Sequence, residues 1–230
     1  SLSPVSDASI ILESLSVKLY PEKRKKENAI AAHSPFIHPM DSAPSNDLPL
    51  LTFYSYRENE KIISIQYQVV FSNEDGGTGH HPSVLMAQWG RMTDIEWVYS
   101  ITLKKGSGDI VAETFQGPGH NTLPFTGEKA GRHPLLHVCT DNGMFCDSGG
   151  GELVSAMEPV HFDPADRPRD AIMNDYPWMF RVMNEEMYAE EKIGQMTPAG
   201  LYLVGDARSY IYVDALIDNQ NGRKTIEFTA

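Results

Sequence analysis

The sequence is short of cysteine, of long apolar runs and of basic residues. Only 2 of its 230 residues are cysteine, which excludes a disulfide-dense scaffold. Two thiols also supply too few ligands for a metal site of their own. No apolar run approaches the roughly 18 residues that a transmembrane helix needs. The sequence therefore predicts a protein without a transmembrane segment.

Basic residues are outnumbered by acidic ones, with 19 Lys and Arg against 31 Asp and Glu and a net charge of −12. This balance argues against nucleic acid as a partner and against attachment to anionic membranes, and it is compatible with bound cations. Catalytic motifs are missing too. No Gly-x-Ser-x-Gly nucleophile elbow occurs, and the sequence gives no sign of a serine or cysteine nucleophile. The order G-x-x-x-x-G-K-[ST] of a phosphate-binding loop is also absent.

Short segments that alternate apolar and polar residues are present, and this period of two is typical of half-buried strands. We expect strands at residues 10–20, 50–56, 62–71, 90–103, 110–115, 135–139, 201–204, 210–217 and 225–228. We expect loops at residues 21–29, 33–49 and 116–134.

A different pattern near the C-terminus predicts helix. Residues 167–193 carry apolar side chains at helical spacing, and Pro177 inside this segment predicts two short helices or one kinked helix. The fold class expected is mainly β: an antiparallel, jelly-roll-like β-sandwich with a short helical segment near the C-terminus. A chain of 230 residues is long enough to bury a sizeable core, so we expect one domain over residues 1–230.

The segment GRMTDIEWVYSITL, residues 90–103, is the clearest strand and carries the candidate site. Alternation predicts one apolar face formed by Ile95, Trp97, Tyr99, Ile101 and Leu103. The opposite face is expected to hold Asp94, Glu96, Val98, Ser100 and Thr102. Residues i and i+2 lie about 7 Å apart along a strand. The carboxylates of Asp94 and Glu96 therefore repel each other unless a cation, an arginine or a proton lies between them.

A glycine-rich loop at residues 72–83 precedes this strand and holds Glu74, Asp75, His80 and His81. Oxygen ligands from Asp75, Asp94 and Glu96 suit Ca²⁺ or Mg²⁺, and Asp141 is a further candidate. Adding His120 or His80 suits a transition metal better. The predicted metal ligands are Asp75, Asp94, Glu96 and His120.

Two other interpretations of Asp94 and Glu96 stay open. They can be an ordinary solvent-facing strand surface, with Arg91 or Lys104 as a neutralising neighbour. They can also be the acid and base of a carbohydrate-active enzyme, for which two carboxylates roughly 5–9 Å apart are needed. His137 lies among apolar residues, a pattern more typical of a core histidine than of a ligand.

Cys139 and Cys146 flank a segment that contains Asn-Gly, a strong turn signal. The spacing is compatible with a disulfide across the turn or with two buried free thiols.

Residues 90–96 resemble the Gly-His-Arg-His-Asp-Trp-Glu heptad of the necrosis- and ethylene-inducing peptide-like cytolysins and of related vacuolar-sorting-type proteins. Gly90, Asp94 and Glu96 match in register. Both heptad histidines are absent, with Arg91 in place of the ligand histidine, and the tryptophan is displaced by one position to Trp97. The later order of a glycine-rich loop with His120 and then a strand beginning HPLLHV is also similar, so the resemblance covers residues 65–146.

This resemblance implies a β-sandwich and a secreted protein that engages a glycolipid or glycan. In that family a divalent cation is held by the heptad carboxylates, a heptad histidine and a loop aspartate, for which Asp75 could stand here. We expect a secreted or periplasmic protein whose leader is not in this sequence. The main hypothesis is a binding protein for a glycan or lipid headgroup; an enzyme and a structural module are the alternatives. The sequence predicts no oligomeric state.

Overall fold

The computed structural model describes residues 25–40, 48–74, 82–140, 143–151 and 153–193. Within these residues the chain forms two β-sheets and four α-helices. The strands predicted at 10–20, 201–204, 210–217 and 225–228 lie outside this part, and the single domain predicted over 1–230 therefore stays a prediction.

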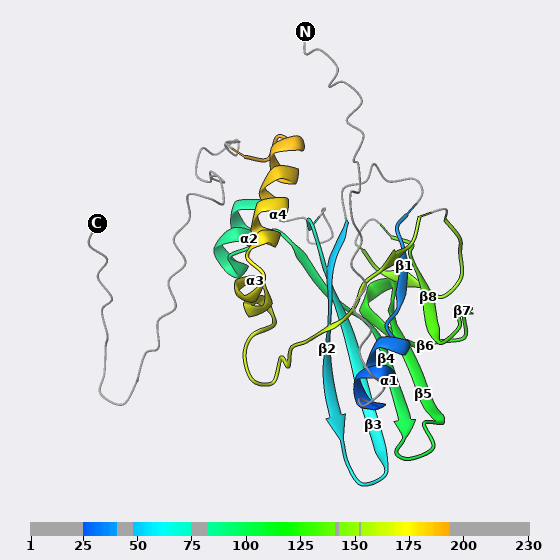
Figure 1. Cartoon of the computed structure of the whole chain (residues 1–230). Helices are drawn as coiled ribbons and strands as arrows, with labels where there is room; N and C mark the ends of the chain where they lie inside the picture. The colour runs from blue at the N-terminus through cyan, green and yellow to red at the C-terminus, as the bar shows by residue number, and fades with distance from the viewer. Residues whose placement is uncertain (1–24, 41–47, 75–81, 141–142, 152, 194–230) are drawn as a thin grey trace, which may run out of the picture.

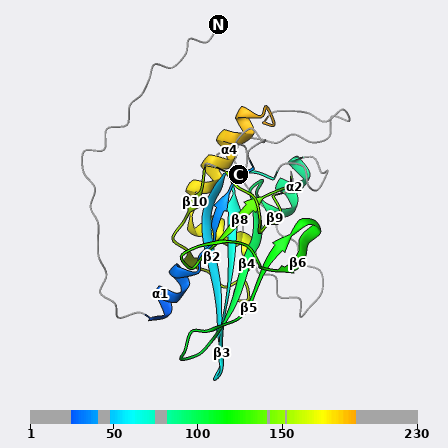
Figure 2. The same ribbon diagram turned by 90° about the vertical axis from the view of Figure 1, so that its right-hand side faces the viewer.

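The larger sheet has the strand order β11-β2-β3-β4-β5-β6. Its strands are β2 (Pro49–Glu58), β3 (Ile62–Phe71), β4 (Asp94–Lys104), β5 (Ile110–Gly117), β6 (Asn121–Pro124) and β11 (Val160–His161). The long strands β2 to β5 run side by side in Figure 2. The strands predicted at 50–56, 62–71 and 110–115 are confirmed, because they fall within β2, β3 and β5.

The smaller sheet has the order β10-β1-β8-β7, with β9 paired to β8. Its strands are β1 (Phe36–His38), β7 (Lys129–Ala130), β8 (His133–Val138), β9 (Phe145–Cys146) and β10 (Ser155–Ala156). The predicted sandwich is confirmed, but its sheets are mixed and not purely antiparallel. Strand β1 pairs in parallel with β8, and β11 pairs in parallel with β2. Both parallel pairs join strands far apart in the sequence, as parallel pairing requires.

A hydrophobic core lies between the two sheets. The larger sheet contributes Ile65, Tyr67, Val69, Phe71, Tyr99 and Ile101, and the smaller sheet contributes Ile37, Leu136, Val138 and Phe145. All of these side chains are at most 8% exposed. Burial of this much apolar surface is the main stabilising contribution to such a fold.

Helices cover the other face of the larger sheet, away from β1, β7 and β8 (Figure 1). They are α2 (Pro82–Trp89), α3 (Ile172–Asp175) and α4 (Trp178–Ala189), with a short 3₁₀ turn at Arg169–Ala171 before α3. A second 3₁₀ turn, Pro118–His120, joins β5 to β6. Ile172, Met173 and Met179 pack on Val70 and Ile95 of the sheet. Pro177 separates α3 from α4, so the prediction of two short helices in 167–193 is confirmed.

Three predicted loops contain regular structure. Helix α1 (Lys25–Ala32) begins inside the loop predicted at 21–29, β1 lies within 33–49, and β6 and β7 lie within 116–134. Helix α1 lies apart from the other helices (Figure 2), and its Ile30 is in the core. The short strands depend on pairing with distant strands rather than on a local pattern, which is why alternation does not reveal them.

Cys139 and Cys146 form a disulfide with a Cα–Cα distance of 5.9 Å, so the bridged alternative is confirmed. The bridge closes the turn between β8 and β9, where His137 pairs with Cys146. Gly143 in this turn has a φ of 65°, a conformation that glycine adopts at no steric cost. None of the helices in the described ranges is long and apolar enough to cross a membrane.

Candidate functional site

Strand β4 contains a β-bulge that reverses the predicted faces of its first half. Tyr67 of β3 lies opposite Tyr99, and Gln68 lies opposite Trp97. Val98 is therefore an extra residue on β4 with no partner of its own in this ladder, and the alternation shifts by one at this point. The prediction that Ile95 and Trp97 share the face of Tyr99 is wrong.

The bulge turns both carboxylates toward the space between the sheets. Asp94 lies opposite Phe71 and Glu96 lies opposite Val69, and both of these partners belong to the core between the sheets. Ile95 instead joins the apolar cluster beneath the helices. Asp94 and Glu96 share a face as predicted, but it is the same face as Tyr99 and not the opposite one.

Both carboxylates are largely buried. Asp94 is 9% exposed, and the side chain of Glu96 is 13% exposed. The β8–β9 turn closes over Asp94, since a Cβ atom on Gly143 would lie 3.2 Å from Asp94 Oδ2. The interpretation of these residues as an ordinary solvent-facing strand surface is therefore wrong.

The surroundings of Asp94 oppose its ionisation. Burial raises the pKa of Asp94 well above its ordinary value of 3.8, and the negative charges of Glu96 and Glu74 raise it further. Asp94 and Glu74 also share a side-chain hydrogen bond, which requires a proton on one of the two carboxyl groups. Glu74, Asp94 and Glu96 form what we call the carboxylate cluster.

Arg91, which could have neutralised the cluster, is paired with a different carboxylate. Its guanidinium is 2% exposed, and its Nε donates a hydrogen bond to Asp170 Oδ1 at 2.5 Å. A second hydrogen bond goes to the carbonyl of Thr93. Arg91 lowers the pKa of Asp94, but the effect is smaller than those of burial and of the two glutamates.

Lys104, the other neighbour considered, lies at the far end of β4. Its ammonium is 4.0 Å from the carboxylate of Asp109. Within the part of the chain that the structure describes, neither Asp94 nor Glu96 forms an ion pair with a lysine or an arginine.

Gln116, at 1% exposure, links Glu96 to His120. Its Nε2 donates hydrogen bonds of 2.7 Å to Glu96 Oε2 and to His120 Nδ1. Its Oε1 is buried and has no hydrogen-bond partner among the residues that the structure describes. Exchanging the amide oxygen and nitrogen would set that oxygen against the Glu96 carboxylate, so the assigned orientation is the favourable one.

His120 lies beside the cluster rather than inside it. Its side chain is 57% exposed, and its Nδ1 is 4.0 Å from Glu96 Oε2. It has a φ of 59°, which is uncommon for a residue other than glycine. Because Nδ1 accepts the Gln116 amide, the neutral ring carries its proton on Nε2, which can donate a hydrogen bond to a ligand.

The predicted metal ligands are thus placed in part. Asp94 and Glu96 lie together, and His120 lies next to Glu96. Asp75, His80, His81 and Asp141 lie outside the described residues. Among the residues that are described, no group of three or more His, Cys, Asp or Glu side chains is placed to hold a metal ion.

Sequence reasoning missed the roles of two residues in this region. Glu74 appeared only as one acidic residue of a glycine-rich loop, and the antiparallel pairing of β3 with β4 brings it to Asp94. Gln116 lay at the start of a predicted loop, and no local pattern distinguishes it.

Two solved structures resemble this fold. NLPPya in complex with mannosamine is 14% identical with a TM-score of 0.42, over 71% of this chain and 85% of that chain. Necrosis and Ethylene inducing Protein 2, from the causal agent of cocoa's Witches Broom disease, is 12% identical with a TM-score of 0.39, over 77% of this chain and 84% of that chain. No protein-family model and no curated protein matches the sequence. The printed name of the second structure is that of the family which residues 90–96 resemble.

Proposed function

We propose that this protein is a non-enzymatic, extracytoplasmic binding protein that uses a divalent cation at Asp94 and Glu96 to engage a glycan or lipid headgroup. One observation carries the proposal: the carboxylates of Asp94 and Glu96 are largely buried, face the same way and have no lysine or arginine ion-pair partner among the described residues. Burial of uncompensated negative charge is costly unless a proton or a cation offsets it.

The chemistry of the donors favours a hard cation. Carboxylate and amide oxygens are ligands of Ca²⁺ and Mg²⁺, and the unpartnered Oε1 of Gln116 adds an oxygen near Glu96. Asp75 and His120 remain the other proposed ligands. Because Ca²⁺ takes six to eight oxygens, a cation with so few protein ligands keeps positions for the hydroxyl or phosphate oxygens of a glycan or headgroup.

The proposed location rests on the disulfide. Disulfides form and persist in oxidising compartments and are rare in the cytosol. The Cys139–Cys146 bridge therefore supports a secreted or periplasmic protein.

A carbohydrate-active hydrolase is the second candidate. It is favoured by the raised pKa of Asp94, since a carboxyl group that keeps its proton is what a general acid needs. Cleavage of a glycan panel by metal-free protein, with loss of cleavage in Asp94→Asn, would favour the enzyme over the binding protein.

Thermal melting tests the cation. The wild type is melted in EDTA and then with Ca²⁺, Mg²⁺ or Mn²⁺, alongside Asp94→Asn/Glu96→Gln. A cation at a hundredfold excess over Kd stabilises the folded state by about 2.7 kcal/mol, so the melting temperature of the wild type should rise and that of the double variant should not.

Asp109→Asn is the matched control, because its carboxylate is 65% exposed on the hairpin at the other end of β4. This variant should respond to the cation as the wild type does. An unchanged melting temperature of the wild type with every cation would overturn the proposal.

A further inference from the structure

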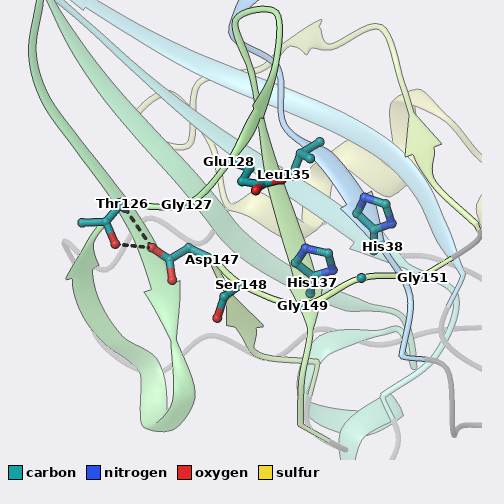
Figure 3. Close-up of a pocket in the computed structure, with 11 residues that line it drawn as sticks. His38, Thr126, Gly127, Glu128, Leu135, His137, Asp147, Ser148, Gly149 and Gly151 are labelled. Carbon is teal, nitrogen blue, oxygen red and sulfur yellow. Dashed lines mark hydrogen bonds between the residues drawn. The ribbon is translucent and has the colours of Figure 1, made fainter.

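A second concave site lies on the outer face of the smaller sheet (Figure 3). Its cavity measures about 500 Å³, within the range of small-molecule pockets. Its side chains include His38, Glu128, Leu135, His137, Asp147 and Ser148. We call it the histidine pocket, and none of its lining residues belongs to the carboxylate cluster.

One side of the pocket is apolar and is formed by two paired strands. His38 lies opposite His137 in the parallel pair of β1 with β8, and their rings stack with centroids 4.5 Å apart. The residues before them, Ile37 and Leu136, are fully buried in the core. Because side chains alternate across a strand, both imidazoles face away from the core, together with Leu135. This side therefore offers ring and methyl carbons to the apolar part of a ligand.

A run of three glycines, residues 149–151, lies along His137. An added Cβ atom on Gly149 would lie 3.0 Å from His137 Cγ, and Gly149 has a φ of 147°. Another residue at this position would be strained and would press on the ring. The backbone can therefore approach the imidazole without adding a side chain to the cavity.

Another side of the pocket carries carboxylates. Asp147 Oδ2 accepts hydrogen bonds from the backbone N–H of Thr126 at 2.8 Å and from its hydroxyl at 2.9 Å (Figure 3). These bonds fix the carboxylate, and Oδ1 forms no hydrogen bond with any residue that the structure describes. Glu128 adds an exposed carboxylate beside Leu135, whose N–H donates to the Glu128 carbonyl at 3.0 Å. The described lining contains no lysine or arginine.

The charge and the donor set of this lining select among ligand classes. Two carboxylates without a basic neighbour repel phosphate, sulfate and carboxylate groups. A metal ion is not favoured, since within the described ranges no group of three or more His, Cys, Asp or Glu side chains is placed to hold one. An organic cation with an apolar stem matches both sides of the pocket, with its stem against Leu135 and the imidazoles and its charge against Asp147 and Glu128.

We propose that the histidine pocket binds an arginine side chain of a basic polypeptide partner. A guanidinium is planar, donates N–H groups to carboxylates and stacks on flat rings, so Asp147 Oδ1 and the Glu128 carboxylate receive its donors. The ammonium of lysine is compact and strongly hydrated, and it gains less from a wall of rings. The net charge of −12 attracts a basic partner. This site is separate from the proposed cation-assisted site and does not rest on it.

Saturation-transfer NMR of the full chain with short peptides tests this site. The probes are acetyl-Gly-Arg-Gly-amide and the same peptide with lysine or citrulline in place of arginine. Citrulline has the shape of arginine without its charge. The arginine peptide should bind, the lysine peptide should bind more weakly, and the citrulline peptide should give no signal. Free arginine should bind no more tightly than the arginine peptide does.

Two charge-matched double variants locate the binding. In Glu128→Gln/Asp147→Asn the affinity for the arginine peptide should fall about tenfold or more, equivalent to roughly 1.4 kcal/mol, because amides keep the shape of the pocket but not its charge. Glu60→Gln/Asp109→Asn removes two exposed carboxylates at the other end of the larger sheet and should bind as the wild type does. Melting temperatures verify folding, and Glu128→Gln alone, at an exposed position, should show a smaller loss if the double variant unfolds.

EDTA and Asp94→Asn/Glu96→Gln separate this site from the carboxylate cluster, and binding of the arginine peptide should persist under both conditions whether or not the cation proposal holds. The inference is overturned if the arginine peptide gives no signal or if the citrulline peptide binds equally well. It is also overturned if the two charge-matched double variants lose affinity equally, because the peptide would then be attracted to the acidic surface in general. Tighter binding of free arginine than of the peptide would overturn the polypeptide partner in favour of a small metabolite.

Discussion

The two faces of the larger sheet differ in what they bury. The face beneath the helices is apolar where Val70, Ile95 and Met179 meet. The face toward the smaller sheet combines an aromatic core around Tyr67 and Tyr99 with Asp94 and Glu96 at one end. Strand β4 contributes to both faces, and the bulge at Val98 decides which residues go to which face. The helical layer thus covers one face of the larger sheet, whereas the face toward the smaller sheet holds the carboxylates of Asp94 and Glu96.

The largest expected effect is on the helical face. Met179 is fully buried, so Met179→Ala should lower the free energy of unfolding by about 2–5 kcal/mol through lost contacts and a cavity. Trp178→Ala is the matched control, because Trp178 is 45% exposed and its loss should have little effect. Urea denaturation measures both.

Met179→Ala also tests whether the helical face of the larger sheet contributes to cation binding on the other face. If the helical face is structural only, folded Met179→Ala should keep the cation-dependent rise in melting temperature. A change near zero in the unfolding free energy of Met179→Ala would mean that the helical segment is a lid or a partner site and not part of the core.

A smaller effect is expected from the disulfide on the sandwich side. Cys139→Ser/Cys146→Ser should lose about 2–3 kcal/mol, as the entropy model gives for a short loop. Urea denaturation of the double variant against the wild type measures the loss. Mass spectrometry of secreted protein, alkylated without reductant, provides the check on the bridge itself; label on both thiols would contradict the bridge and weaken the proposed location.

The smallest expected effect is a pH dependence specific to the sandwich face. Asp94 has a higher pKa in the folded chain than its ordinary value of 3.8, so the folded state holds this proton more tightly than the unfolded state does. Its contribution to stability is full below the ordinary pKa and is lost as the pH rises through the raised pKa. In EDTA, the wild type should therefore lose stability relative to Asp94→Asn as the pH rises above the ordinary pKa of 3.8.

A bound cation should reverse this trend, because it favours the deprotonated carboxylate. The stabilisation by Ca²⁺ should accordingly grow as the pH rises. Urea denaturation of both proteins at several pH values, with EDTA and with Ca²⁺, gives the comparison. A difference between wild type and Asp94→Asn that stays constant with pH would show that Asp94 is not titrating in this range.

The main strands and the two C-terminal helices could be predicted because apolar residues recur at strand or helix spacing within each segment. The sandwich was then predicted from the number of such strands. The sequence also predicted that Asp94 and Glu96 share a face. The direction of that face could not be predicted, since it depends on one unpaired residue, Val98, in the ladder with β3. The link from Gln116 to Glu96 and the stacking of His38 on His137 depend on strand pairing over distances that no local pattern encodes.

The short segment from Gly143 to Asp147 touches both sites. Gly143 lies against Asp94, and Met144 Sδ is 3.5 Å from the amide of Gln116. Cys146 pairs with His137, and Asp147 forms the wall of the histidine pocket. A substitution in this segment therefore alters two sites at once, whereas one in β3 or at Glu128 alters a single site. Mutational change at the two sites is not independent, and this segment should tolerate fewer substitutions than the burial of Met144 and Phe145 alone would predict.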